Sequence, residues 1–512
     1  MDGQANIGTG SCPPTTEAVV AEARQAFEEL IRFCQSEERT FGEFEKRLLV
    51  LLFGLGRVLT RLMLVHRHLQ LKLEPYQGMK GYRLGDTYAE RKLKTVFGEV
   101  IYGRAHYIGK NGNNGFHPLD VALGLTRDGF SPWIVQFVTR LATRMSYSAC
   151  RLICTAALGW SPSTEVIEQL VLGLGRQAAP FMQQMGAPPD DGDVLVIELD
   201  GKCPPTATEQ ELNKRRGKRR HPKGCTCGCQ RHRGKAKRQA RGSKKRRQKG
   251  DKSKNGKEAM VIVMYTLRRG TDGKLHGPIN KQTWATCGGR KAAALWAREA
   301  ATRRGFGPDT TKTVQIVVDG ARGLKDQLEP LFPNAIFTLD VCHVVEKLWE
   351  VGHRFHKEGS EELKAWVEEL KELVYKGRVA TLVKRLETLL KQVPVRGPGT
   401  KARRQALKRL IGYLKPRLKM MRYGEWIKQD LVIASGQVEG AVRYVVGERM
   451  DCAGMRWIPQ RAEALLRLRC IELNGDWETF IAWAYQRYQD KLRNCDVVQI
   501  RTNEPIDLPR AA

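Results

Sequence analysis

The sequence predicts an α/β core that follows a mainly helical N-terminal region containing a β-hairpin. Three patterns lead to this prediction. Apolar residues recur at helical spacing over residues 15–75, β-rich runs ending in aspartate appear from residue 194, and amphipathic helical patterns fill residues 343–490. The chain has 512 residues, of which 41% are hydrophobic. This is enough for about two to four domains with buried cores.

Residues 1–92 are predicted to form a helical region. Its longest apolar stretch, Leu48–Val58, is too short to span a bilayer, so we expect a buried helix there. Residues 1–20 lack the basic and apolar segments of a secretory signal. The 13 cysteines are odd in number and scattered, which favours a reducing interior over a disulfide framework.

Residues 93–186 combine a predicted hairpin with a helix-turn-helix pattern. The run Thr95–Tyr107 is β-rich and ends in the glycine-rich loop Gly109–Gly115, which is typical of a hairpin turn. A helix over Tyr147–Ala157 and a second one starting at Ser161-Pro162 flank a tight turn. Either DNA recognition or an ordinary helical hairpin fits this pattern, and acidic residues on the second helix weigh against DNA contact.

Charge is concentrated in one insert. The net charge is +32, and residues 213–257 hold 21 lysines and arginines with a single acid, Asp251. Such a segment cannot bury apolar surface, and it favours a polyanionic partner. No apolar run is long enough for a membrane span, so we expect nucleic acid rather than a membrane. The candidate DNA contacts in its basic clusters are Lys214, Arg215, Arg216, Lys244, Lys245, Arg246 and Arg247.

The same insert carries thiol and imidazole side chains that could hold zinc. They are His221, Cys225, Cys227, Cys229 and His232. Their C-x-C-x-C-x₂-H spacing differs from the usual C-x₂-C pair, so a flexible basic arm that grips phosphates is the alternative.

After a linker over Gly186–Gly192, residues 193–342 form a predicted core in which several strands end in a carboxylate. Asp200, Asp319 and Asp340 each close such a run. Carboxylates at the ends of adjacent strands converge on one edge of a sheet, where Mg²⁺ or Mn²⁺ can bind. The predicted strands are Val194–Asp200, Ala259–Leu267, Trp284–Cys287, Val314–Asp319 and Ala335–Asp340.

The order of these elements is RNase H-like. A strand with an aspartate, two further strands, another strand with an aspartate and a fifth strand precede a helix with a glutamate, here Glu439. Residues 343–430 would form an all-helical insertion, residues 431–490 the final core helices, and residues 491–512 a tail. Glu198, Glu346 and Glu448 are alternative carboxylates; Glu198 shares the strand face of Asp200 and is predicted to be an ordinary polar position.

From about Phe97 to Trp477 the chain resembles bacterial insertion-sequence transposases of the DDE, Mutator-like superfamily, most closely the ISKra type. The matching segments are Phe97–Val100, Phe116–Leu125, Leu199–Lys202, Val317–Ala321, Leu339–His343, Gly436–Glu439 and Gly454–Trp457. The resemblance implies that Asp200, Asp319 and Glu439 bind two Mg²⁺ or Mn²⁺ ions. It also implies that Asp340 and His343, a D-x-x-H motif, support the site. Arg443, and equally Arg456 and Trp457, could meet a phosphate or be structural.

The expected function is therefore a DDE transposase. It would bind transposon ends in double-stranded DNA, cleave them hydrolytically and transfer the 3′-OH end to target DNA. Family analogy implies a homodimer or larger assembly in the bacterial cytoplasm, associated with the nucleoid. The alternatives are an RNase H-like nuclease without strand transfer, an inactive DNA-binding derivative, and an RNA-binding protein.

Overall fold

The structure is a computed structural model that describes residues 14–36, 40–73, 81–109, 115–213, 257–320, 323–452 and 454–493. The chain divides into two compact units. The first contains Met1–Met185 with Ala464–Ile506, and the second contains Gly186–Glu463. The predicted zinc ligands and basic DNA contacts of residues 214–247 lie outside the described residues.

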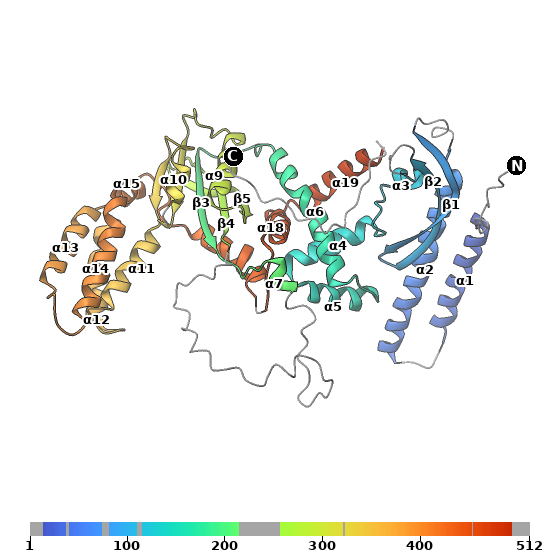
Figure 1. Ribbon diagram of the computed structural model, residues 1–512, viewed down its shortest axis with the longest axis horizontal. Helices are drawn as coiled ribbons and strands as arrows, with labels where there is room; N and C mark the ends of the chain where they lie inside the picture. Colours follow the sequence, from blue (N-terminus) through green and yellow to red (C-terminus); the bar gives the residue numbers. More distant parts are fainter. Residues whose placement is uncertain are drawn as a thin grey trace. The chain divides into compact units, whose positions relative to one another are not determined.

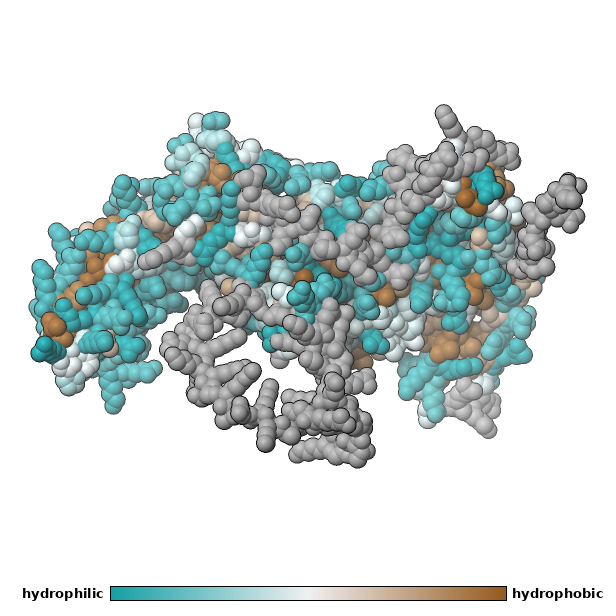
Figure 2. All heavy atoms as spheres, in the orientation of Figure 1, coloured by the Kyte–Doolittle hydropathy of each residue, from teal (hydrophilic) through white to brown (hydrophobic). Residues whose placement is uncertain are grey.

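The first unit begins with two long helices, α1 (Thr16–Cys34) and α2 (Phe41–Gln70). Thr40 and Glu43 form a capping box that starts α2. The prediction of a buried helix over Leu48–Val58 is wrong, because Leu49, Val50 and Leu52 are exposed. Figure 2 shows hydrophobic residues at the surface around these two helices. A regular apolar pattern predicts that a helix forms, but it does not predict whether another element covers the apolar face of that helix.

By length and composition, α2 could also cross a membrane; it is the one helix of which this holds among the described residues. Core helices of soluble proteins pass the same test, although here only 17% of the apolar window is buried. The prediction that no apolar run is long enough for a membrane span was therefore wrong, and the expected lack of membrane contact stays a prediction.

A hairpin is present, but its turn lies inside the run Thr95–Tyr107, which was predicted to be one strand, and its first strand was missed. Strands β1 (Tyr82–Thr95) and β2 (Gly98–Gly109) pair antiparallel and turn at residues 96–97. Residues 82–92 were predicted to belong to a helical region; charged residues interrupt their alternation. The chain also reverses after β2, because Tyr107 and Phe116 exchange two backbone hydrogen bonds.

The segment Phe116–Leu125 has a structural role beneath this hairpin. It contains α3 (Pro118–Leu123), whose Asp120 is buried and forms ion pairs with Arg91 at 2.8 Å and Arg104 at 2.7 Å. Leu119 and Leu125 join a buried apolar cluster with residues of α2, β1 and β2. The segment Phe116–Leu125, one of those that carry the family resemblance, therefore stabilises the first unit.

Both helices of the predicted helix-turn-helix are present. α5 (Tyr147–Leu158) ends at Gly159, which has a φ of 73°. α6 (Thr164–Gln184) begins two residues later than predicted, because the N-cap is Ser163 rather than Ser161. The Ser163 hydroxyl accepts a hydrogen bond from the Val166 amide. The remaining helices of this unit are α4 (Pro132–Arg144), most of α18 (Pro459–Asn474) and α19 (Trp477–Arg493).

The second unit is built on a five-stranded mixed sheet with the order β5-β4-β3-β6-β7 (Figure 1). β4 runs antiparallel to β3 and to β5, while β3, β6 and β7 are parallel. Four of the five predicted strands are confirmed, and the fifth, Trp284–Cys287, covers only the end of a longer strand, β5. The observed strands are β3 (Val194–Lys202), β4 (Ala259–Arg269), β5 (Leu275–Thr286), β6 (Thr313–Val318) and β7 (Ile336–Leu339), with α7 (Glu209–Asn213), α9 (Arg290–Arg303) and α10 (Leu324–Leu328) between them.

Residues 343–430 are helical, as predicted. α11 (Val341–Gly352) packs on α12 (Glu361–Tyr375) and α14 (Thr400–Leu414), and α13 (Val379–Gln392) contacts both of the latter. The predicted apolar face of α12 is buried at Leu363, Val367, Leu370 and Val374. The chain then passes through η2 (Lys415–Met420) and α15 (Tyr423–Lys428) to α16 (Gly436–Ala441), the π-helical turn η3 (Val442–Gly447) and α17 (Glu448–Met450).

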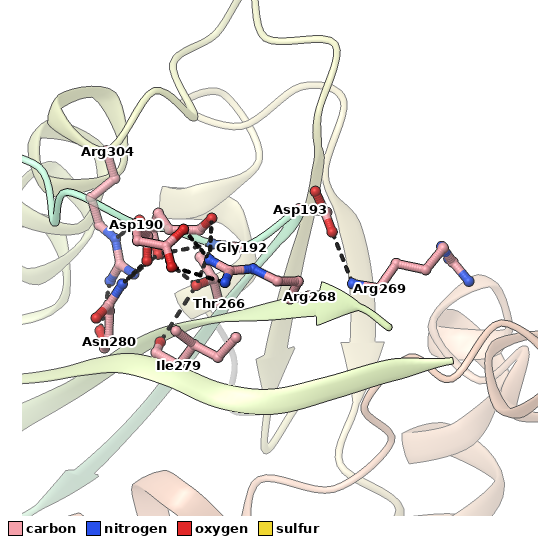
Figure 3. Close-up of polar contacts among 10 residues, drawn as sticks. Asp190, Gly192, Asp193, Thr266, Arg268, Arg269, Ile279, Asn280 and Arg304 are labelled. Carbon is pink, nitrogen blue, oxygen red and sulfur yellow. Dashed lines mark hydrogen bonds and ion pairs between the residues drawn. The ribbon is translucent and has the colours of Figure 1, made fainter. Parts of the chain in front are cut away.

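The start of the second unit is held by a cluster of charged residues (Figure 3). Asp191 receives two hydrogen bonds of 2.7 Å from Arg304, and both side chains are largely buried. Arg268 donates to both carboxylate oxygens of Asp190. The Gly192 amide donates to Thr266 Oγ1, so residues 190–192 are fixed against β4.

We expect Asp191→Asn to lower the free energy of unfolding by about 2 kcal/mol, because Arg304 would lose a charged partner while an amide oxygen still accepts one hydrogen bond. Denaturant unfolding of the full chain measures this change. Asp190→Asn is the matched control; its side chain is exposed, so its replacement should cost well under 1 kcal/mol. Equal effects of the two variants would contradict the inferred role of Asp191.

Candidate active site

Three aspartates stand in one row across the parallel strands. Leu199 on β3 is paired with Val318 on β6, and Val318 is paired with Leu339 on β7. The residue that follows each of them is an aspartate: Asp200, Asp319 and Asp340. Since adjacent strands lie about 4.8 Å apart, the three residues are neighbours at the same edge of the sheet. The convergence expected from the sequence is therefore present.

Asp200 and Asp319 repel each other. Burial raises the pKa of Asp200 above its usual value, and the negative charge of Asp319 raises this pKa further. The Asp200 carboxylate accepts a hydrogen bond of 2.6 Å from the Gly201 amide. A bound cation would relieve the remaining repulsion, so this pair suits a divalent metal ion.

Asp340 differs from the other two aspartates because its oxygens are already occupied. It is fully buried, caps α11 through the Cys342 amide at 2.9 Å, and accepts 2.7 Å hydrogen bonds from His343 Nδ1 and Ser435 Oγ. The hydrogen bond to Asp340 raises the pKa of His343 to about 9. Asp340 therefore orients a positively charged His343.

Glu439 completes the cluster from α16. Its Oε1 lies 3.8 Å from His343 Nδ1, and one ligand atom each of Asp340, His343 and Glu439 falls within 4.8 Å of the others. Burial, followed by the charge of Asp340, raises the pKa of Glu439. His343 interacts electrostatically with Asp200 and with Asp319. It therefore links the aspartate pair to Glu439.

Buried polar side chains of the sheet hold the segment that delivers Glu439. The Gln315 side chain donates to the Val432 carbonyl at 2.6 Å and accepts from the Val432 amide at 3.0 Å. Glu198 is fully buried and accepts hydrogen bonds from the Val438 amide at 2.8 Å and the Tyr265 hydroxyl at 2.7 Å. Because Val438 precedes Glu439, Glu198 is a positioning residue.

The prediction of an ordinary polar position for Glu198 was therefore incomplete. Its spacing from Asp200 indicated the shared strand face, but only the tertiary structure shows that the return segment covers this face. Burial raises the pKa of Glu198 to about 7, although the hydrogen bonds that Glu198 accepts lower this pKa.

We expect Glu198→Ala to weaken Mn²⁺ binding by the candidate carboxylates about 10- to 100-fold, because two buried donors lose their acceptor and α16 is no longer fixed. Glu198→Gln keeps an acceptor for the Val438 amide, and Tyr265 can rotate its hydroxyl. The Mn²⁺ affinity of this variant should therefore stay within a few fold of that of the native protein. Calorimetric Mn²⁺ titration of both variants tests this. Equal losses in both would mean that the charge of Glu198, not its position, matters.

The corner after β6 is held by the helices that follow. The Tyr413 hydroxyl donates to the Asp319 carbonyl at 2.8 Å, and Arg417 donates to the Gly320 carbonyl at 2.8 Å. Gly320 has a φ of 77°, and a Cβ there would lie 2.7 Å from both Leu339 and Tyr413. Asp319 therefore needs glycine as its neighbour and depends on α14 and η2 for its position.

Glu258 and Arg290 also belong to the site, although sequence reasoning missed both. Arg290 donates to both Glu258 oxygens, at 3.0 and 3.1 Å. The charge of Glu258 raises the pKa of Asp200. The pKa of Arg290 is raised mainly by the hydrogen bonds that Arg290 donates to Glu258, and the charge of Asp319 raises it further. Glu258 follows the basic insert directly and carries no motif, so no sequence signal singled it out.

The other predicted residues divide between surface and core. Arg443 is exposed one turn after Glu439, and Arg456 is exposed as well. Trp457 is buried, donates its indole N–H to the Met450 carbonyl, and pairs with the segment after β3 through Thr206. Its role is structural. Glu346 and Glu448 are exposed on α11 and α17.

No protein-family model matches the chain. Over 121 residues it is 32% identical to a Streptococcus gallolyticus protein described as "UPF0236 protein in vanSb 3'region". The match covers 23% of this chain and 26% of that protein. The "Drosophila P element transposase strand transfer complex" aligns with 70% of this chain and 95% of its own at 11% identity, with a TM-score of 0.27, too low to indicate a shared fold. The chain is thus similar to about a quarter of a bacterial relative, and the ISKra type stays a prediction.

Proposed function

We propose that this chain is a DDE-type DNA transposase with an RNase H-like core. The observation that carries the proposal is the row of Asp200, Asp319 and Asp340 at one sheet edge, with Glu439 brought to His343 beside it. Carboxylates gathered in this way are typical of enzymes that act on phosphodiesters with divalent metal ions.

Asp200, Asp319 and Glu439 are the residues that would hold Mg²⁺ or Mn²⁺. Their carboxylate oxygens are the donors that these ions prefer, and the raised pKa values of Asp200 and Glu439 indicate carboxylates that a cation would stabilise. Two bound ions would activate the attacking oxygen and stabilise the leaving oxygen in an in-line displacement.

The other residues of the site have distinct tasks. Asp340 is saturated by its three donors, so it orients His343 instead of binding a metal. The positive charge of His343 stabilises the closely spaced carboxylates. Glu198 and Gln315 fix the segment before Glu439. Arg443 is exposed beside the site and would contact a phosphate of the DNA.

The experiment is an assay of the full chain with DNA from either side of its reading frame, with Mg²⁺ or Mn²⁺. We expect cleavage that leaves a 3′-OH, followed by joining of that end to a target duplex. Cleavage without joining would favour a nuclease, and binding without cleavage an inactive DNA-binding derivative. Preference for RNA would overturn the proposal. A homodimer, the cytoplasmic location and zinc binding by the basic insert are further parts of the proposal, which sedimentation, cell fractionation and metal analysis would test.

A further inference from the structure

An open groove of about 1030 Å³ lies beside the carboxylates in the second unit. Its lining starts at Gly320, next to Asp319, and continues between α11 and α14. Small residues on α14, among them Ala402, Ala406 and Gly412, line it, and a Cβ at Gly412 would meet nothing within 4 Å. The groove is therefore accessible to a bulky chain that approaches α14 closely.

One face of α11 connects the site to this groove. His343, Lys347 and Arg354 are separated by four and seven residues, so they follow one stripe along the helix and just beyond its end. Lys347 and Arg354 both line the groove, and Glu350 is its single acidic residue. At 1.5 Å per residue these two cations stand about 10 Å apart, farther than one phosphate group can bridge.

The cations of the groove are not neutralised. Among the described residues, Lys347, Arg354, Lys408 and Arg409 form no ion pair, although Lys347 stands 4.8 Å over the Tyr413 ring. On α12, by contrast, both lysines are paired with glutamates, as Lys364–Glu361 and Lys371–Glu368. The groove thus carries four cations that form no ion pair among the described residues.

We propose that this groove binds the sugar–phosphate backbone of the DNA strand that continues from the cleavage site. Spaced, unpaired cations above small residues suit a repeating row of phosphates, and contacts to phosphates carry no sequence information directly. Contact would be independent of sequence and would set the direction in which the strand leaves the carboxylates. The inference rests on the proposed function, because it assigns a path along the groove to the DNA substrate of that function.

The test compares Lys408→Gln/Arg409→Gln with Lys364→Gln/Lys371→Gln, which removes the same charge from paired positions on α12. Binding of a duplex carrying the cleavage site is measured with the full chain at several salt concentrations. For the groove variant, the magnitude of the slope of log K against log salt should decrease by about 2. The affinity for the duplex near 0.1 M salt should decrease roughly ten- to sixty-fold. The α12 variant should match the native protein.

A second measurement locates the strand. A photo-crosslinking residue in place of Gln405, which lines the groove, should react with backbone positions on one side of the cleavage site, whereas the same residue in place of Lys371 should not. Native salt dependence in the groove variant, or no crosslink from Gln405, overturns the inference even if the chain cleaves DNA. A native chain that binds DNA in the groove but never cleaves it would instead contradict the proposed function.

Discussion

Asp319→Asn is expected to lower metal-dependent DNA cleavage by about 10³-fold or more while leaving the metal-free protein at least as stable as the native one. The loss follows because a ligand that stabilises charge in the transition state is worth several kcal/mol, and each 1.4 kcal/mol is a factor of ten. Stability is retained because Asp319 repels Asp200; burial raises the pKa of Asp200, and the charge of Asp319 raises it further. The Asp319 carbonyl still accepts from Tyr413 in the variant.

Cleavage rates with Mn²⁺ and thermal melting with a chelator measure the two effects. Asp326→Asn is the matched control, because Asp326 is an exposed aspartate of the same unit on α10. Cleavage within tenfold of the native rate in Asp319→Asn would remove Asp319 from the metal site. A large drop in melting temperature would show that Asp319 is structural.

Asp340→Ala is expected to destabilise the second unit by about 3–5 kcal/mol, the largest stability loss that we predict. The variant removes a fully buried carboxylate, and His343, Ser435 and the Cys342 amide lose the acceptor that they share. DNA cleavage should fall with it, since His343 would no longer be oriented. Denaturant unfolding monitored by tryptophan fluorescence measures the loss.

The pH dependence of the stability of the Asp340→Asn variant distinguishes the contribution of the Asp340 charge from that of its packing. In the native protein the pKa of His343 is raised to about 9, above its unfolded value near 6.5. The His343–Asp340 pair therefore stabilises the fold fully below pH 6.5 and loses this contribution as the pH rises through 9. The metal-free Asp340→Asn variant should not show this loss of stability between pH 6.5 and 9. An unchanged pH profile would contradict the charged pair.

Much of this site could be predicted from the sequence, because it depends on local patterns. The β-branched runs before Asp200, Asp319 and Asp340 predict strands, and strands that end in aspartate predict a shared edge. The metal assignment of Glu439 rested on resemblance, since other acids competed for the role.

What the sequence did not predict depends on contacts between distant segments. The burial of Glu198 arises from residues 240 positions later in the chain. The Glu258–Arg290 pair needs the sheet to form first. β1 was missed because more than half of its residues are exposed and charged residues interrupt its apolar alternation. The exposure of α2 could not be predicted either, because an apolar pattern does not reveal which faces are covered.

The long helical segment between Asp340 and Glu439 also has a consequence during protein synthesis. A ribosome adds roughly 5–20 residues each second, so the three aspartates emerge several seconds before the glutamate that would complete the site. Until then Gln315, Asp340 and Glu198 have no return segment to bind. A nascent or truncated chain that does not include Glu439 therefore cannot assemble the full set of proposed ligands, and the proposed DNA cleavage would begin only after this residue has emerged.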